Sequence, residues 1–399
     1  MKFAFNKLKY IHFNDIVDFV KIVLAFLPGM VLKAIKKEIW LVAERENDAH
    51  DNGYWFYKYV RENYPEKNVY YAISFDCPDY ESRIKPLGNA IKYGSFKHHV
   101  YFWATTKYIS PHVGNGFPAP FMCRLFLMSG FYKFKVAFLQ HGIIKDYTGF
   151  LESDKNKFDL FVTSTDRERQ YIIDALKYPD ETVQLLGLCR YDNLNDVKVI
   201  KNRILIMPTW RWWLYPEYGK KNEDVIEEIR NSQYYKNFKE LFSNERLLSF
   251  IKENNLEFVY FPHNQMQPFL DEFRQTCPGI ICAKATEYDV QQALKDAAFL
   301  ITDYSSIFFD FAYMKKPLVY FQFDYEEYSE KHYAKGYFEY DKDGFGPSVQ
   351  TVDQVVDALI NSFENGFEMD ELYKQRVDAF FTYRDNENCR RNYEAIEKL

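Results

Sequence analysis

The sequence predicts an α/β protein of two Rossmann-like domains whose parallel sheets face a central cleft, preceded by an amphipathic helical segment. Short apolar runs with strand character alternate with helical patterns, which is typical of βαβ units. The alternation restarts near residue 200, after Asn193, Asn195 and Asp196 dilute the apolar pattern. We therefore divide the chain into an N-terminal segment (residues 1–38), a first domain (39–197) and a second domain (198–399).

The N-terminal segment is apolar over residues 16–35 but is too short and too often interrupted to cross a bilayer, which needs about 18 to 20 consecutive apolar residues. Pro28-Gly29 is expected to break it, and no small-residue cleavage site follows it, so it is not a secretory signal. Lysines that could meet anionic lipid headgroups flank or interrupt it: Lys2, Lys7, Lys9, Lys21, Lys33, Lys36 and Lys37. A helix that packs against the first domain is the alternative.

The strands expected in the first domain cover residues 39–43, 69–75, 108–110, 135–139, 160–163 and 183–186, with helices starting at Asp51 and Asp166. In the second domain we expect strands over 203–207, 258–261, 299–302 and 317–321, and a helix from Val352. Ligands of open parallel sheets bind beyond the carboxyl ends of the strands. The polar residues that follow these strands are therefore the candidate site residues.

Composition restricts the class of protein. The net charge is −6 and the basic residues are scattered outside the N-terminus, so no nucleic-acid footprint is present. Six dispersed cysteines fit reduced thiols better than a disulfide framework. The sequence has no Walker loop, dinucleotide fingerprint, zinc-protease motif or nucleophile elbow. Asp341-Lys342-Asp343 reads as a solvated loop, so no metal site is predicted.

Residues 301–306 are a candidate phosphate site. A buried strand runs into Asp303-Tyr304-Ser305-Ser306, and a mostly apolar helix follows. One serine could simply cap that helix. Two adjacent hydroxyls at a helix start favour phosphate binding, because a cap needs only one of them.

Two histidines follow strands in corresponding places. His141 follows the strand over 135–139, and His263 follows the strand over 258–261. A histidine at such a place can act as a general base on a hydroxyl, although a hydrogen-bonded loop histidine is the alternative. Lys145 lies close enough in sequence to tune His141, and His112 is a weaker candidate. Arg211 offers a guanidinium fork for phosphate, unless it forms a surface ion pair.

These motifs together resemble the CDP-glycerol glycerophosphotransferase family, which includes wall teichoic acid primases and polymerases and related capsule polymerases. The resemblance runs from about residue 39 to 328. It rests on Glu44-Arg45 with Asp51-Asn52-Gly53, Gln140-His141-Gly142, Gly187-Leu188-Cys189-Arg190-Tyr191-Asp192, Pro208-Thr209-Trp210-Arg211, residues 301–306 with Asp310, Lys316-Pro317, and Tyr325-Glu326-Glu327-Tyr328.

The resemblance implies a two-lobed GT-B fold with an acceptor-binding first domain and a CDP-polyol-binding second domain. An acceptor hydroxyl, deprotonated by His141, would attack the phosphorus that bears the glycerol, and CMP would leave while His263 neutralises its charge. Residues implied to bind the donor are Thr209, Arg211, Asp303, Ser305, Ser306, Glu326 and Glu327. Residues implied to bind the acceptor are Asp51, Asn52, Gly53 and Lys145.

The resemblance further implies a peripheral protein at the cytoplasmic face of the cell membrane. Its partners would be CDP-glycerol, a glycerol-phosphate or saccharide polymer acceptor that can be lipid-linked, and the membrane surface. No cofactor and no nucleic acid are expected. A GT-B glycosyltransferase using a sugar nucleotide and a non-catalytic nucleotide- or lipid-binding membrane protein remain as alternatives. The residues leave open glycerol against ribitol, primase against polymerase, and teichoic acid against capsule.

Overall fold

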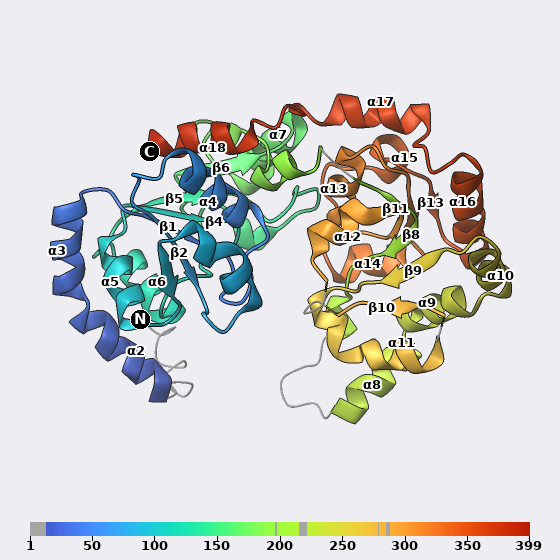
Figure 1. The fold of residues 1–399 in the computed structure, drawn as a ribbon, viewed down its shortest axis with the longest axis horizontal. Coiled ribbons are helices and arrows are strands. Elements are labelled where there is room, and N and C mark those ends of the chain that lie inside the picture. The colour runs from blue at the N-terminus through green and yellow to red at the C-terminus, as the bar shows by residue number, and fades with distance from the viewer. Residues whose placement is uncertain (1–12, 196–197, 215–221, 278, 285–287) are drawn as a thin grey trace. The chain divides into compact units, whose positions relative to one another are not determined.

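The computed structural model describes residues 13–195, 198–214, 222–277, 279–284 and 288–399 (Figure 1). The chain forms two compact units. The first holds the described residues up to His141, with Leu151–Asp192 and Asp385–Leu399, and the second holds Gly142–Phe150 and Asn193–Arg384. The predicted boundary at residue 197 is therefore near the observed one, but two segments depart from it. Residues 142–150 join the second unit, and the C-terminal residues return to the first.

The first unit contains a seven-stranded parallel sheet in the order β3-β2-β1-β4-β5-β6-β7. Successive side chains of β1 lie on opposite faces of the sheet. Trp40 and Val42 belong to the hydrophobic core on one face, and Leu41 and Ala43 belong to the core on the other. Burial on both faces explains the continuous apolar runs of the sequence. The strands are β1 (Trp40–Ala43), β2 (Val69–Ile73), β3 (Ala90–Lys92), β4 (Lys107–Ser110), β5 (Lys135–Phe138), β6 (Leu160–Thr163) and β7 (Val183–Leu185).

Helices α4, α5 and α7 of the first unit begin at polar residues whose side chains cap them. Ser95 accepts the amide of His98 at 3.2 Å, and Thr165 accepts that of Glu168 at 3.0 Å. The C-terminal helix is capped from a distance, because the Asp192 carboxylate accepts the amides of Asn388 and Cys389. The helices are α2 (Phe13–Leu24), α3 (Phe26–Lys36), α4 (Asn52–Asn63), α5 (Phe96–Ala104), α6 (Pro120–Met128), α7 (Asp166–Leu176) and α18 (Asn388–Glu397).

The second unit repeats the same plan. Its six-stranded parallel sheet has the order β10-β9-β8-β11-β12-β13. The strands are β8 (Ile200–Ile206), β9 (Glu257–Tyr260), β10 (Ile281–Cys282), β11 (Ala297–Thr302), β12 (Leu318–Phe321) and β13 (Ser348–Val349). The helices are α8 (Asn222–Asn231), α9 (Gln233–Ser243), α10 (Glu245–Glu253), α11 (Leu270–Thr276), α12 (Val290–Asp296), α13 (Ile307–Tyr313), α14 (Tyr325–Lys331), α15 (Tyr340–Asp343), α16 (Val352–Glu364) and α17 (Glu371–Phe380). The prediction of an α/β protein with two parallel sheets is confirmed.

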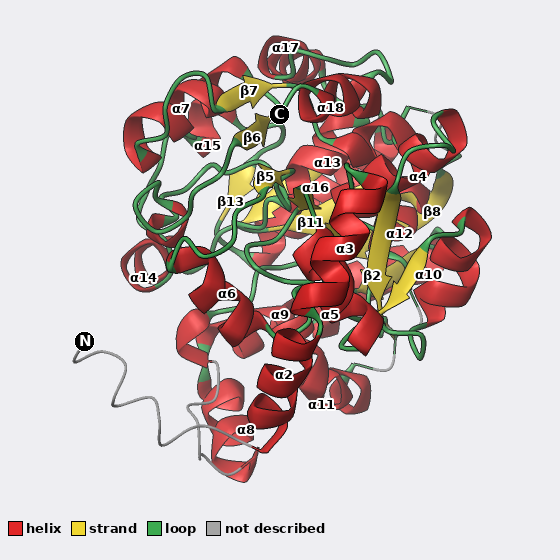
Figure 2. Cartoon of the chain, turned by 90° about the vertical axis from the view of Figure 1, so that its left-hand side faces the viewer, coloured by secondary structure: helices red, strands yellow, loops and turns green. Residues whose placement is uncertain are grey.

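Helices α2 and α3 cover part of the first unit, and α3 packs against α5 (Figure 2). Gly29 permits this approach, since a Cβ atom there would lie 2.3 Å from Cβ of Trp103. The break between the helices falls at Ala25 and not at Pro28-Gly29, because proline is tolerated in the first turn of a helix. Within the described residues, no helix is long and apolar enough to cross a membrane. The lysines before residue 13 lie outside the described residues.

Candidate active site

In both units the polar candidates follow the two strands at which the strand order reverses or a strand beside them. In the first sheet the chain runs outward in one direction from β1 to β3 and in the other direction from β4 to β7. In the second sheet it does the same from β8 to β10 and from β11 to β13. Such switch points open a crevice at the carboxyl ends of the strands, where ligands bind. In the first unit Asp51 follows β1, His112 follows β4 and His141 follows β5.

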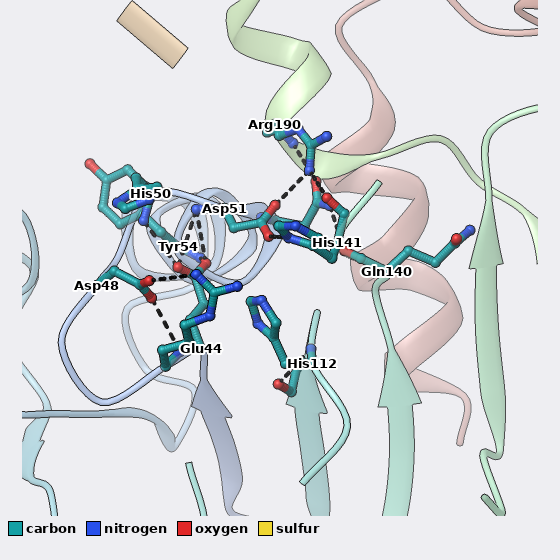
Figure 3. Close-up of polar contacts among 12 residues, drawn as sticks. Glu44, Asp48, His50, Asp51, Tyr54, His112, Gln140, His141 and Arg190 are labelled. Carbon is teal, nitrogen blue, oxygen red and sulfur yellow. Dashed lines mark hydrogen bonds and ion pairs between the residues drawn. The ribbon is translucent and has the colours of Figure 1, made fainter. Parts of the chain in front are cut away.

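Asp51 contacts both His141 and Arg190 (Figure 3). Its Oδ2 atom lies 2.7 Å from Nδ1 of His141, and its Oδ1 atom accepts from Nη1 of Arg190 at 2.6 Å. The Asp51 side chain is 9% exposed, whereas that of His141 is 62% exposed. The carboxylate is therefore fixed inside the protein while the imidazole is open to a substrate.

Backbone amides around the buried Glu44 carboxylate shape the loop that presents Asp51. Glu44 accepts the amides of His50 at 3.0 Å, Asp51 at 3.1 Å and Tyr54 at 2.6 Å. Gly53 leaves room for this carboxylate, since a Cβ atom there would lie 3.0 Å from Cγ of Glu44. These contacts fix the start of α4, where the Asp51 side chain caps the helix by accepting the amide of Asn52 at 2.8 Å.

Asn52 and Gly53, predicted to bind the acceptor, have a supporting position instead. Asn52 is fully buried; its Nδ2 atom donates to the carbonyl of Gln140 at 2.7 Å, and its Oδ1 atom accepts the amide of Arg190 at 3.0 Å. It thereby ties the segments that carry His141 and Arg190 to the start of α4. Of the three residues Asp51, Asn52 and Gly53, Asp51 is the one whose side chain contacts the candidate base His141.

The charges of this cluster favour an ionised Asp51. Burial alone would raise the Asp51 pKa, but the charges of Arg190 and His141 outweigh it and hold the pKa well below its usual range. Burial and the Asp51 charge raise the pKa of Glu44. An ionised Asp51 accepts the Nδ1–H of neutral His141, which leaves the lone pair on Nε2 as a base. We assign this tautomer from the hydrogen bond.

In the second unit Arg211 is fully buried between two aspartates. Its guanidinium donates to Asp303 Oδ2 at 2.8 Å and to both carboxylate oxygens of Asp324, at 2.7 and 3.0 Å. It also donates to the carbonyl of Thr209 at 2.6 Å. The predicted direct phosphate contact of Arg211 is therefore corrected: the side chain holds the ends of β8, β11 and β12 together. Asp303, predicted to bind the donor, is likewise fully buried within this network.

Residues on the rim of this network keep free polar groups. Asp303 Oδ1 accepts the amide of Thr209 at 2.7 Å, and among the described residues the buried Oγ1 of Thr209 has no hydrogen-bond partner. Ser305 and Ser306 are half-buried at the start of α13, and the Ser306 side chain makes no cap hydrogen bond. The Ser306 hydroxyl therefore does not cap the helix, and phosphate binding by Ser305 and Ser306 stays a prediction.

An aromatic column connects this loop with His263. Tyr304 stacks on Tyr328 with ring centroids 3.8 Å apart, and Tyr328 stacks on His332 at 4.7 Å. His332 meets the edge of Trp210 at 5.5 Å, and Trp210 stacks on His263 at 5.6 Å. These ring contacts connect His263 with Tyr304, which lies two residues before Ser306 in the chain.

His332 is a candidate that sequence reasoning missed. Its Nδ1 atom accepts the amide of Trp212 at 3.2 Å, so its Nε2 atom carries a proton that it can donate. Burial, reinforced by the charges of Arg211 and Lys145, lowers the His332 pKa to about 4. His332 ends a helix rather than a strand, so the strand-end criterion passes over it. Arg190 lies in a family motif, but no local pattern reveals its contact with Asp51.

The remaining candidates lie in the second unit. Lys145, predicted to bind the acceptor, is buried, pairs with Asp146 and lies 5.5 Å from the Tyr340 ring centroid. Glu326 is exposed, and its predicted role in donor binding stays a prediction. Glu327 pairs with Lys331 at 2.8 Å and lines an open cavity of 610 Å³ with Trp213.

The chain is similar to known proteins in sequence and in fold. A family model described as CDP-glycerol:poly(glycerophosphate) glycerophosphotransferase matches residues 26–398. The minor teichoic acid biosynthesis protein GgaB of Bacillus subtilis is 33% identical over 368 residues, which are 91% of this chain and 40% of that protein. The teichoic acid poly(glycerol phosphate) polymerase of Bacillus subtilis is 27% identical over 181 residues, 45% of this chain and 21% of that protein. The chain therefore spans well under half the length of both relatives.

The fold has a counterpart among solved structures. A histidine-to-alanine variant of the wall teichoic acid polymerase TagF superposes with a TM-score of 0.66 and 14% identity, over 97% of this chain and 98% of that one. A putative UDP-N-acetylglucosamine 2-epimerase from Listeria monocytogenes superposes with a TM-score of 0.54 and 12% identity, over 90% and 96% of the two chains. These likenesses confirm the GT-B-like fold class.

Proposed function

The chain belongs to the CDP-glycerol:poly(glycerophosphate) glycerophosphotransferase family, and on that premise we propose that it transfers glycerol phosphate, or a similar polyol phosphate, from CDP-glycerol to a hydroxyl group of an oligomeric or lipid-linked acceptor. CMP is the second product, and the polymer is of the teichoic acid or capsule type. The observation that carries this proposal is the pairing of the exposed His141 imidazole with the buried Asp51 carboxylate.

The first unit supplies the base. Nε2 of His141 takes the proton of the acceptor hydroxyl as its oxygen attacks the phosphorus that bears the glycerol. The new P–O bond replaces the bond to the bridging oxygen of the pyrophosphate, and CMP leaves with that oxygen. Asp51 stabilises the imidazolium that forms, and Arg190 keeps Asp51 ionised. A positioned general base contributes about 10²- to 10⁴-fold in rate.

The second unit binds the donor. Ser305, Ser306 and Thr209 offer hydroxyls to the phosphates, and His263 and His332 offer ring N–H groups along the aromatic column. Phosphoryl transfer depends mainly on positioning and on stabilisation of charge. Arg211 acts here as a positioning residue, because its buried ion pairs fix the loops that carry Thr209 and Ser305. We expect that no cofactor is required.

We further propose that α2, α3 and α6 rest on the cytoplasmic surface of the membrane. One side of α3 is packed through Gly29, while Leu27 (71% exposed) and Ile35 (72%) stay in solvent. Met128 at the end of α6 is 85% exposed. Lys33 and Lys36 in the last turn of α3 donate to Tyr132 at 3.3 Å and to Asn68 at 2.8 Å, whereas Lys37 is exposed and can meet anionic headgroups. One face of the segment packs on the first unit, and the proposal assigns the exposed face to the membrane.

The direct test is incubation of the purified chain with CDP-glycerol, CDP-ribitol or a sugar nucleotide, together with glycerol-phosphate oligomers and lipid-linked acceptors. CMP release that depends on the acceptor and a product longer by polyol phosphate units support the proposal, and the preferred donor identifies the polyol. The His141→Ala variant is the matched control. Release of UDP from a sugar nucleotide, or nucleotide binding without turnover on any acceptor, would contradict the proposal.

A further inference from the structure

His112 lies beside the His141–Asp51 pair without a hydrogen-bonding role for its ring. Both ring nitrogens are buried, and among the described residues neither has a hydrogen-bond partner. The ring centroid is 5.0 Å from that of His141, and Figure 3 shows the imidazole directed towards His141 and Asp51. A buried imidazole with two unsatisfied nitrogens is unfavourable unless a ligand or water satisfies it.

The three side chains provide a donor set for a metal ion. One atom each from Asp51, His112 and His141 lies within 4.8 Å of the others, a separation that small side-chain rotations can close around one ion. Two imidazoles and one carboxylate favour borderline metals such as Zn²⁺ and Co²⁺ over Mg²⁺, which prefers oxygen ligands. Asp51 offers Oδ2 only, because Arg190 occupies Oδ1.

We propose that Asp51, His112 and His141 form a transition-metal site whose occupation switches the transferase off. The inference rests on the proposed function of His141 and adds a mode of regulation to the same site. The metal takes the place of the proton shared between Nδ1 of His141 and Oδ2 of Asp51. With the metal on Nδ1, the imidazole proton moves to Nε2 and no lone pair remains to accept the proton of the acceptor hydroxyl.

The neighbouring charges make this binding reversible. The guanidinium of Arg190 contacts Asp51, and the charge of Arg45 also acts on His112, so a divalent cation meets two positive neighbours. The exposed His141 ring leaves the site open to exchange with solvent. We therefore expect a chelatable inhibitory site rather than a structural one.

The first arm of the test measures metal binding by the full chain without substrate. Addition of Co²⁺ alone should give a saturable visible absorption band, and titration with Zn²⁺ should give one site that competes with Co²⁺. His112→Phe keeps a ring of similar size and breaks no protein hydrogen bond, so it should fold normally but lose the band. His112→Asn is a second variant, and His50→Asn is the matched control that should retain the band.

The second arm measures CMP release. Zn²⁺ should inhibit the unmodified chain and EDTA should restore activity, whereas His112→Phe should keep its basal rate and lose at least tenfold in sensitivity to Zn²⁺. Metal binding that persists in both His112 variants would overturn the site. Loss of activity on EDTA treatment, or a His112→Phe variant inactive without metal, would overturn the inhibitory role. The first arm needs no turnover, so metal binding at this site can be judged even if the chain does not catalyse the proposed transfer.

Discussion

The Oδ2 atom of Asp51 lies 2.7 Å from Nδ1 of His141, although the two residues are 90 positions apart in the sequence. Arg190 binds the other oxygen of the same carboxylate. One buried aspartate therefore orients the candidate base and is itself kept ionised. This relationship gives the proposed reaction its most direct test.

Asp51→Asn should lower kcat for CMP release by about 10²- to 10⁴-fold, because an amide that donates to Nδ1 favours the wrong tautomer of His141. The KM for CDP-glycerol should change little, since the proposed donor site lies in the second unit. Steady-state kinetics measures both, and circular dichroism checks the fold because Arg190 loses a partner. An unchanged kcat would contradict the assignment of His141 as the base.

Arg211→Met should destabilise the second unit by about 3 to 5 kcal/mol, because it leaves two buried carboxylates without their cation. Urea unfolding followed by intrinsic fluorescence measures the loss. The matched control is Arg230→Met, which removes an exposed ion pair with Glu272 and should cost less than about 1 kcal/mol. If the Arg211→Met variant were as stable as the unmodified chain and only its KM for CDP-glycerol were raised, the result would favour a direct contact of Arg211 with phosphate.

Ser306→Ala should raise the KM for CDP-glycerol about tenfold, because one hydrogen bond to a charged phosphate contributes about 1.5 kcal/mol or more. Unfolding stability should not change, since the Ser306 side chain makes no cap hydrogen bond. Ser329→Ala is the control, because that hydroxyl binds the carbonyl of Glu326 within its own helix. Equal KM values for the two variants would remove Ser306 from the donor site.

The double variant Leu27→Glu with Ile35→Glu should bind poorly to vesicles containing anionic lipid, because both side chains are largely exposed on α3. Co-sedimentation with vesicles at several salt concentrations measures the loss. Leu372→Glu on α17 replaces a side chain that is 55% exposed in the second unit and should leave binding intact. Vesicle binding that survives the double variant would place the membrane contact elsewhere.

Acid should destabilise the first unit through His98. Burial, followed by the charge of His99, lowers the pKa of His98 to about 3, against an ordinary value of 6.5. The folded state then binds fewer protons than the unfolded state, so stability falls as the pH drops from 6.5 towards 3 and is unaffected above 6.5.

The His98→Gln variant should reduce the slope of the free energy of unfolding against pH by about 1.4 kcal/mol per pH unit between pH 6.5 and 3. Urea unfolding at several pH values in this range measures the slope. His50 provides the opposite control. Its burial opposes protonation, but the hydrogen bond to Asp79 and the charges of nearby carboxylates together outweigh burial and raise the His50 pKa to about 9. The stability it contributes is present below pH 6.5 and is lost as the pH rises through 9. An acid slope that is identical with and without His98 would contradict its buried neutral state.

The sequence predicts ten of the observed strands from their short apolar runs: β1, β2, β4, β5, β6, β7, β8, β9, β11 and β12. The edge strands β3, β10 and β13 have only two or three residues and little apolar signal, so the sequence does not reveal them. The sequence predicts His141, Ser305 and Ser306 as site residues because the carboxyl end of a strand can be recognised from the local sequence pattern.

The sequence by itself determined the fold class, the family and the strand ends at which site residues stand. Only the tertiary structure decided which of those residues contact one another. Arg211 pairs with Asp324 across 113 positions, and Arg190 with Asp51 across 139. Periodicity describes residues that are near in the chain, whereas these ion pairs form because strands distant in the chain lie side by side in a sheet. In the structure Arg211 is buried in ion pairs and supports the surrounding loops, whereas the sequence predicts a phosphate contact for it. The structure also places His112 next to His141.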